Sequence, residues 1–133
     1  MRFAVDRLDH LVVTCRDVDV SASWYQRVLG MEREAFGPDG GRTALRFGGQ
    51  KINLRPAEAT QQAWFTGRAA APGTQDLCFV VTFTTMDVVA HLHDCGVTVE
   101  LGPVMREGAL GPMKSVYCRD PDGNLIEISS YSG

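Results

Sequence analysis

The pattern of apolar and polar positions predicts one series of elements that occurs twice along the chain. The first series opens with an apolar, β-branched strand, followed by a helix whose apolar residues recur at helical spacing. Three further strands separated by glycine-rich turns complete it. The predicted elements of this half are a strand at 8–15, a helix at 17–30, and strands at 31–36, 42–47 and 51–55.

The helix has recognisable end signals in the sequence. Asp19 or Ser21 is the expected N-cap, because side chains of this type accept a hydrogen bond from the first helical amides. Gly30 stands where a left-handed residue would close the helix. The aromatic pair Trp24 and Tyr25 is expected to pack in the core under the sheet.

A polar, alanine-rich connection at 56–74 separates the two halves, so we expect modules at 7–55 and 75–131 within one domain, residues 1–133. The second module repeats the order, with a helix closed by Gly96 and a Gly/Pro-rich loop between its second and third strands. Its predicted elements are strands at 76–83, 97–101, 114–119 and 124–130, a helix at 85–95, and a loop at 102–113. The fold class predicted is α+β, with two βαβββ modules.

The repetition aligns polar residues that lie inside apolar strands. A shift of 66 residues carries Leu11 onto Leu77 and His10 onto Asp76. A shift of 74 residues carries Asn53 onto Glu127. Because side chains alternate along a strand, these groups are predicted to lie on the faces that the helices do not cover.

His10, Asp76 and Glu127 form a candidate metal site. Two carboxylates facing one cavity would repel each other, and a divalent cation bound by an imidazole and two carboxylates removes that penalty. Each residue also has an ordinary structural interpretation. His10 alone fits a hydrogen-bonded core or surface histidine, Asp76 fits a loop cap, and Glu127 fits a solvated edge residue.

Composition narrows the range of partners. The chain has 13 Lys and Arg against 16 Asp and Glu, a formal charge of −3, which disfavours a nucleic-acid binder. No apolar run approaches the roughly 20 residues of a membrane-spanning helix, and no secretory signal is apparent. The four cysteines have no CxxC spacing and are expected to be buried thiols, so we expect a cytoplasmic protein.

Three motifs carry a family resemblance. They are Leu8-Asp9-His10, Trp24-Tyr25 with Leu29-Gly30-Met31, and Asp120-Pro121-Asp122-Gly123-Asn124-Leu125-Ile126-Glu127. Over residues 7–131 the chain resembles the vicinal-oxygen-chelate superfamily, which includes glyoxalase I, extradiol dioxygenases, fosfomycin-resistance enzymes and bleomycin-binding proteins. The stretches Gln50-Lys51-Ile52-Asn53-Leu54 and Gly102-Pro103-Val104 look like the glyoxalase domain-containing subgroup, some members of which are bacterial virulence proteins.

The resemblance implies that the two βαβββ modules form a curved mixed sheet around a central cavity. It also implies a homodimer that binds a metal and a small-molecule substrate. His10 and Glu127 match the family's ligands, whereas Asp76 stands where a histidine is usual. Asn53 stands where glyoxalase I has a second glutamate, and an amide cannot take up a proton. One histidine with two carboxylates neutralises a divalent ion, which favours Mn, Fe, Ni or Mg, with Zn as a further candidate.

The same resemblance supplies further candidate site residues. Ser115 and Tyr117 match hydroxyls that touch the substrate in fosfomycin-resistance enzymes, and Arg106 in the predicted loop is a candidate contact for an anionic substrate, with a solvated loop arginine as the alternative. We expect Glu127 and Tyr117 to be catalytic, and Asn53 to contact substrate with Ser115, Tyr117 and Arg106.

Three functions remain open from the sequence. The first is a metal-dependent lyase, isomerase or ring-opening enzyme acting on a small oxygen-rich molecule. The second is a metal-free binding protein of the bleomycin-resistance kind. The third is a regulatory module with a vestigial site, in which Asp76 marks a lost histidine ligand.

Overall fold

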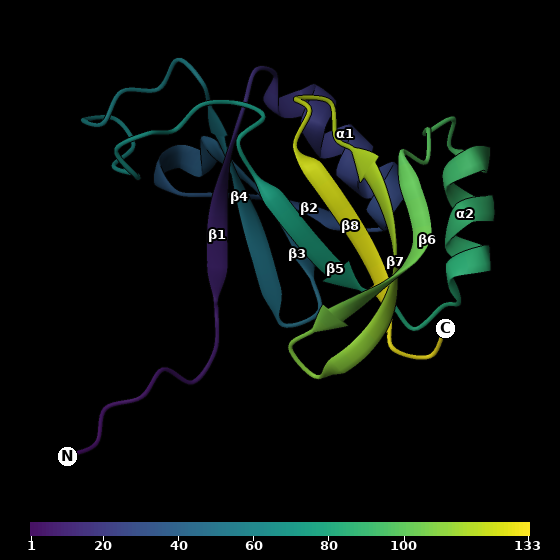
Figure 1. Cartoon of the computed structure of the whole chain (residues 1–133). Helices are drawn as coiled ribbons and strands as arrows, with labels where there is room; N and C mark the ends of the chain where they lie inside the picture. The colour runs from purple at the N-terminus through teal and green to yellow at the C-terminus, as the bar shows by residue number, and fades with distance from the viewer. The chain divides into compact units, whose positions relative to one another are not determined.

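Each half of the chain forms its own four-stranded mixed sheet with one long helix. The computed structural model describes residues 1–133 and divides them into two units, Met1–Ala70 and Ala71–Gly133 (Figure 1). Both units follow the order βαβββ, with an additional short 3₁₀ turn in the first. The predicted α+β class and the repeated element order are therefore confirmed.

In the first unit the sheet order is β1-β4-β3-β2. Strand β1 runs parallel to β4, while β4 with β3 and β3 with β2 are antiparallel. The elements are β1 (His10–Cys15), α1 (Val18–Leu29), β2 (Glu32–Phe36), the 3₁₀ turn η1 (Pro38–Gly40), β3 (Arg42–Phe47) and β4 (Gln50–Pro56). A parallel pair needs a crossover connection, which α1 and the β2–β3 hairpin supply here.

The second unit repeats this arrangement with the sheet order β5-β8-β7-β6. Strand β5 is parallel to β8, and the other neighbours are antiparallel. The elements are β5 (Asp76–Val80), α2 (Thr85–Asp94), β6 (Leu101–Gly108), β7 (Gly111–Arg119) and β8 (Leu125–Ser130). Strands β6 and β7 form a long hairpin, which Figure 1 shows in green.

The N-cap of helix α1 lies two residues before Asp19 and four before Ser21, the two predicted caps. Asp17 is the N-cap, and its carboxylate accepts a hydrogen bond from Val20 N at 3.0 Å, so the prediction of Asp19 or Ser21 was wrong. Ser21 is instead buried within the helix. Gly30 closes the helix with φ 67°, as predicted. Tyr25 is fully buried and Trp24 nearly so, which confirms them as core aromatics.

The predicted loop at 102–113 is wrong, because β6 and β7 extend through most of it. The predicted strand at 97–101 is also shifted, since only Leu101 belongs to β6. Pro103 misled the prediction because it lacks an amide hydrogen. It is tolerated here because β6 is an edge strand and its register slips between Leu101 and Val104.

Each sheet has one apolar face and one face with polar side chains. In the first unit Val13, Leu45 and Ile52 are buried on the apolar face, and α1 contacts β3 and β4. In the second unit Val116, Ile126 and Ile128 are buried in the same way, and α2 contacts β7 and β8. We call the opposite face of each sheet its open face; alternation places His10, Asn53, Asp76 and Glu127 on these open faces.

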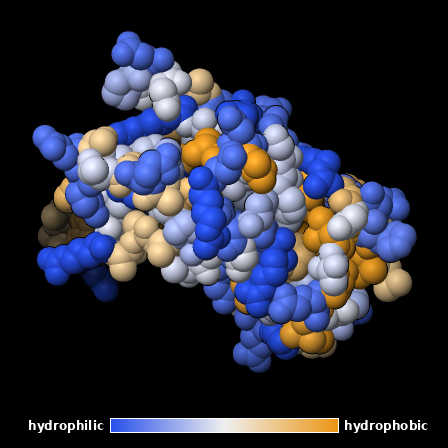
Figure 2. Space-filling model, turned by 90° about the horizontal axis from the view of Figure 1, so that it is seen from above, coloured by the Kyte–Doolittle hydropathy of each residue, from blue (hydrophilic) through white to orange (hydrophobic).

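The surface of the protein carries both polar and apolar side chains. Figure 2 shows a mostly hydrophilic face with apolar side chains in separate patches, and the large exposed apolar residues include Phe3, Phe65 and Leu110. No helix is both long and apolar enough to cross a bilayer.

None of the four cysteines forms a disulfide, but only Cys15 and Cys118 are buried. The expectation of four buried thiols is wrong for Cys78 and Cys95, because Cys78 lies on an open face and Cys95 follows α2.

Candidate functional site

His10 starts β1 and is held by its neighbour. Its Nδ1 lies 2.8 Å from Asp9 Oδ2, and the hydrogen bond to His10 lowers the pKa of the Asp9 carboxyl. Nε2 has no hydrogen-bond partner, and the side chain is 44% exposed. A carboxylate on one imidazole nitrogen orients the ring and leaves the other nitrogen to bind a metal.

Glu127 lies in the middle of β8 and is fixed by serine hydroxyls. Ser115 Oγ donates to Glu127 Oε2 at 2.6 Å, and Ser129 Oγ donates to the same oxygen at 3.3 Å. The two hydroxyl oxygens are themselves 2.7 Å apart. All of these hydrogen bonds to the Glu127 carboxylate end on Oε2, so Oε1 remains available to another group on the open face.

Asp76 is the first residue of β5 and lies on the same open face. It is exposed, and its carboxylate forms no hydrogen bond or ion pair. Its register partner is Leu125, while the next residue of β5 on this face, Cys78, is the partner of Glu127. The carboxylates of Asp76 and Glu127 are therefore on adjacent strands, one step apart along the open face.

Tyr117 and Arg106 lie on the other side of Glu127. Tyr117 is the register partner of Glu127 on β7. Arg106 Nε donates to the Tyr117 hydroxyl at 2.9 Å, and the guanidinium carbon lies 5.5 Å from the Tyr117 ring centre. Arg106 belongs to β6, so its predicted place in a loop is wrong. Its hydrogen bond to Tyr117 holds the two side chains together.

The structure gives Ser115 and Asn53 different environments. Ser115 is fully buried, and its hydroxyl is engaged by Glu127 and Ser129. Asn53 is 6% exposed, and its Oδ1 is a buried oxygen with no hydrogen-bond partner. Asn53 pairs with Val12 of β1, which places it on the open face that also carries His10.

Sequence reasoning missed several residues around these groups. Asp9 and Ser129 make hydrogen bonds to predicted ligands, and Cys78 Sγ lies 3.2 Å from Ser129 Oγ. Burial raises the pKa of the Cys78 thiol. The signal was present, because Ser129 is two positions from Glu127 and so shares its face, and Asp9 directly precedes His10.

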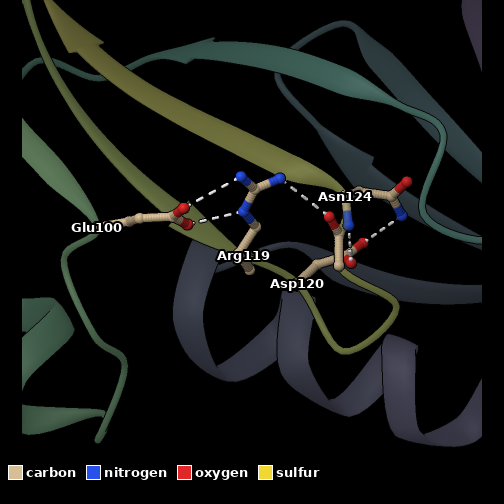
Figure 3. Close-up of polar contacts among 5 residues, drawn as sticks. Glu100, Arg119, Asp120 and Asn124 are labelled. Atoms are coloured by element: carbon tan, nitrogen blue, oxygen red, sulfur yellow. Dashed lines mark hydrogen bonds and ion pairs between the residues drawn. The ribbon is translucent and has the colours of Figure 1, made fainter.

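A buried turn holds the β7–β8 hairpin that carries Tyr117 and Glu127. Asp120 Oδ1 accepts hydrogen bonds from the amides of Asp122 and Asn124, both at 2.9 Å, and Oδ2 accepts from Asn124 Nδ2 at 2.7 Å. Asn124 Oδ1 in turn accepts from Gln75 N at 2.9 Å, directly before β5. Figure 3 shows the contact between Asp120 and Asn124. Gly123 N also donates to Asp120 O at 3.0 Å, which confirms the prediction of a hairpin turn at 120–123.

An ion pair supports the same hairpin from outside. Arg119 Nε lies 2.7 Å from Glu100 Oε2, and Nη2 lies 3.1 Å from Oε1 (Figure 3). The hydrogen bonds from Arg119 lower the pKa of Glu100, and Glu100 raises the pKa of Arg119. This bidentate geometry fixes the end of β7 next to the turn.

The candidate metal ligands are divided between the two units. His10 belongs to the first unit, and Asp76 and Glu127 belong to the second. Within either unit, no three histidine, cysteine, aspartate or glutamate side chains are grouped so that they could hold a metal ion.

Comparison with known proteins identifies the family. The model of the glyoxalase/bleomycin resistance protein/dioxygenase superfamily matches residues 7–128. A glyoxalase domain-containing protein of Mycosarcoma maydis is 48% identical over 98% of this chain and 71% of its own length. A virulence protein of Salmonella typhimurium is 43% identical over 98% of this chain and 88% of its own length.

A solved structure agrees with these relatives in sequence and in fold. An integron cassette protein from the mobile metagenome of V. cholerae is 43% identical, covers 98% of this chain and 99% of its own, and superposes with a TM-score of 0.92. The resemblance to glyoxalase domain-containing and virulence proteins is thereby confirmed. The chain belongs to the glyoxalase/bleomycin resistance protein/dioxygenase superfamily.

Proposed function

We propose that this chain is a metal-dependent enzyme that acts on a small oxygen-rich substrate, with His10, Asp76 and Glu127 as the metal ligands. The observation that carries the proposal is that each of these side chains has a donor atom left over. Asp9 occupies His10 Nδ1 and leaves Nε2 unpaired. Serine hydroxyls occupy Glu127 Oε2, and the Asp76 carboxylate has no hydrogen-bond partner.

The donor set fits a divalent ion. One imidazole nitrogen and two carboxylate oxygens suit Mn, Fe, Ni or Mg, and Zn accepts the same donors. The two negative charges balance the charge of the ion, which removes the repulsion between two carboxylates on one face. Superfamily members typically depend on a divalent metal, bind small-molecule substrates and often form dimers. We extend the metal, the small-molecule substrate and the homodimer to this chain.

In this proposal Tyr117 and Glu127 transfer substrate protons. Arg106 donates its Nε hydrogen to the Tyr117 oxygen, so the hydroxyl hydrogen of Tyr117 stays available to a substrate oxygen. Tyr117 is directly opposite Glu127 on β7 and β8, so a donor and an acceptor share one row of the open face. A bound metal would supply Lewis acidity for lyase, isomerase or ring-opening chemistry at vicinal substrate oxygens.

The other predicted site residues, Arg106, Asn53 and Ser115, help to position the substrate. Arg106 carries a positive charge beside Tyr117, and Asn53 has a buried carbonyl oxygen without a hydrogen-bond partner. Ser115 acts through its hydrogen bond to Glu127, in place of the direct substrate contact that the resemblance implies.

The test is the metal content of the purified full-length protein. We expect the wild type to retain close to one divalent ion per chain by mass spectrometry, and His10→Ala and Glu127→Ala to lose it. His91→Ala is the matched control, because His91 is exposed on α2 and should keep the metal. Equal metal content in the wild type and both ligand variants would overturn the proposal.

A metal-free binding protein is the second candidate, and the identity of residue 76 favours testing it. Family members usually have a histidine here, and Asp76 is exposed and unpaired. If Asp76 is a lost ligand, as in a binding protein or a vestigial site, Asp76→His should raise metal affinity sharply. If Asp76 is a true ligand, Asp76→His should weaken binding of Mn or Mg, since these ions prefer oxygen donors.

A further inference from the structure

Three basic side chains surround Asn53 on the open face of the first sheet. Lys51, Asn53 and Arg55 alternate along β4 and so share one face. On the adjacent strand β3, Ala44 is the partner of Asn53, and Arg42 lies two residues from Ala44 on that same face. We call this surface, made by Arg42, Lys51, Asn53 and Arg55, the Asn53 face.

None of the three cations on the Asn53 face is paired with a carboxylate. Arg55 is only 3% exposed, and its guanidinium donates to carbonyl oxygens, to Ala59 O at 2.9 Å and to Trp64 O at 3.1 Å. Burying a charge without a counter-charge is unfavourable. The buried guanidinium therefore contributes a positive potential to this face.

The other two cations rest on aromatic rings. Lys51 Nζ lies 4.0 Å from the Phe36 ring centre, and the Arg42 guanidinium carbon lies 4.1 Å from the Trp64 ring centre. Arg42 also donates to Ala63 O at 3.1 Å. Aromatic rings hold a cation without neutralising it, so both groups can still bind an anion.

Two acidic side chains of β2 share this face, because Glu34 is the register partner of Ala44 and Glu32 is the register partner of Arg46. Glu34 lies 2.5 Å from Arg46 Nε, and Asp9 is bonded to His10. Glu32, on the outer strand β2, is exposed. Glu34 is paired with Arg46, so Glu32 stands against the cations Arg42, Lys51 and Arg55, and the Asn53 face keeps a net positive charge.

Asn53 indicates that a ligand of this face must also donate a hydrogen bond. Its Oδ1 is buried and has no hydrogen-bond donor, although buried polar atoms are almost always satisfied. Lys51 and Arg55 on either side already have other contacts. A ligand that donates a hydrogen bond to Oδ1 would remove this cost.

We propose that the Asn53 face binds a small carboxylate that carries a hydroxyl group next to the carboxylate. The carboxylate is held by Lys51 and Arg42, and the hydroxyl donates its hydrogen to Asn53 Oδ1. The inference deepens the proposed function and rests on it for the role of the site, because His10 is the register partner of Lys51 on β1 and so shares this face. Binding of the anion itself requires only residues of the first unit.

The test compares two probes that differ by one hydroxyl, glycolate and acetate, titrated into the full-length protein with detection by backbone amide chemical shifts. We expect glycolate to bind about tenfold more tightly than acetate, the ratio that corresponds to one hydrogen bond to a buried oxygen. Equal affinity for the two probes, or no binding of either, would overturn the proposal.

Two variants separate the hydroxyl contact from the charge. Asn53→Leu removes the amide at similar volume, so the preference for glycolate should disappear, while the melting temperature of the free protein rises because a buried unsatisfied oxygen is gone. Lys51→Met should weaken both probes by a similar factor and keep their ratio. Lys114→Met, on β7 of the second unit, is the control and should bind as the wild type does. A glycolate preference that persists in Asn53→Leu would contradict the inference.

The same titration in His10→Ala distinguishes the two proposals. Loss of metal with retention of the glycolate preference supports both, because the Asn53 face does not need His10 to bind the anion. Retention of metal in His10→Ala refutes the metal ligand set, whereas loss of the glycolate preference in this variant refutes the Asn53 face as an independent anion site.

Discussion

Ser115 Oγ donates a hydrogen bond to Glu127 Oε2 across 2.6 Å between the neighbouring strands β7 and β8. Ser115 is fully buried, and its oxygen also lies 2.7 Å from Ser129 Oγ. A carboxylate held by two hydroxyls on one oxygen has little freedom to rotate. The other oxygen is therefore presented in a fixed direction, which is what a metal ligand or a proton acceptor requires.

Replacing Ser115 with alanine should affect metal binding and stability together. Loss of a hydrogen bond to a charged group is expected to lower the free energy of unfolding by about 1–2 kcal/mol, measured by urea denaturation. Loss of an outer-shell partner should weaken Mn binding by about tenfold or more, measured by calorimetry. Ser130→Ala is the matched control, since Ser130 is buried on the opposite face of β8 and accepts a hydrogen bond from Ser132 N. Wild-type Mn affinity in Ser115→Ala would show that the serine does not position Glu127.

Asp9→Asn tests whether the neighbour of His10 prepares it for a metal. Asp9 is exposed and lies 2.8 Å from His10 Nδ1, so its replacement should leave the urea midpoint nearly unchanged. We expect metal affinity to fall by about tenfold, because the imidazole loses the carboxylate that orients it. Asp6→Asn provides the comparison, since Asp6 pairs with Arg7 outside the sheet. If both variants bind metal equally well, Asp9 has no such role.

Asp120→Ala should be among the most destabilising single changes in the second unit. The side chain is 5% exposed and accepts three hydrogen bonds, from the amides of Asp122 and Asn124 and from Asn124 Nδ2. Leaving these buried donors unsatisfied is expected to cost about 2–4 kcal/mol in the free energy of unfolding. Glu100→Gln, which breaks an exposed ion pair of the same hairpin, should shift the urea midpoint much less. Similar midpoints for the two variants would contradict this interpretation of the turn.

Much of the fold could be predicted because local signals and hydrophobic periodicity agreed. Glycines with left-handed backbone close α1 and follow α2 at the predicted positions, Gly30 and Gly96. The alignment of His10 with Asp76 and of Asn53 with Glu127 also placed polar residues on the correct open faces. The meeting of His10 with the two carboxylates stays a prediction.

The features that sequence could not predict depend on contacts between distant residues. The sequence predicts a loop at 102–113 because Pro103, Gly108 and Gly111 break the strand pattern, yet pairing between β6 and β7 outweighs their poor strand propensity. For a related reason, the sequence does not show that the cations of the Asn53 face lack a carboxylate partner. Whether Arg55 meets a carboxylate or the carbonyl oxygen of Trp64 is decided by how the chain after β4 returns to it.

Cys118 should make stability fall at alkaline pH. Burial, and secondarily the negative charge of Asp120, raises the pKa of this thiol from 9.0 to about 11 in the folded protein. Between these values the unfolded chain releases a proton that the folded chain keeps, so unfolding becomes more favourable as pH rises, and below the lower value the effect is absent. Urea midpoints of the wild type should therefore decline more steeply over this interval than those of Cys118→Ala, even though the alanine variant starts lower because of the small cavity. Every other ionisable group is present in both proteins, so the difference between the two slopes isolates the thiol. Parallel slopes would show that Cys118 ionises equally easily in the folded and unfolded chain.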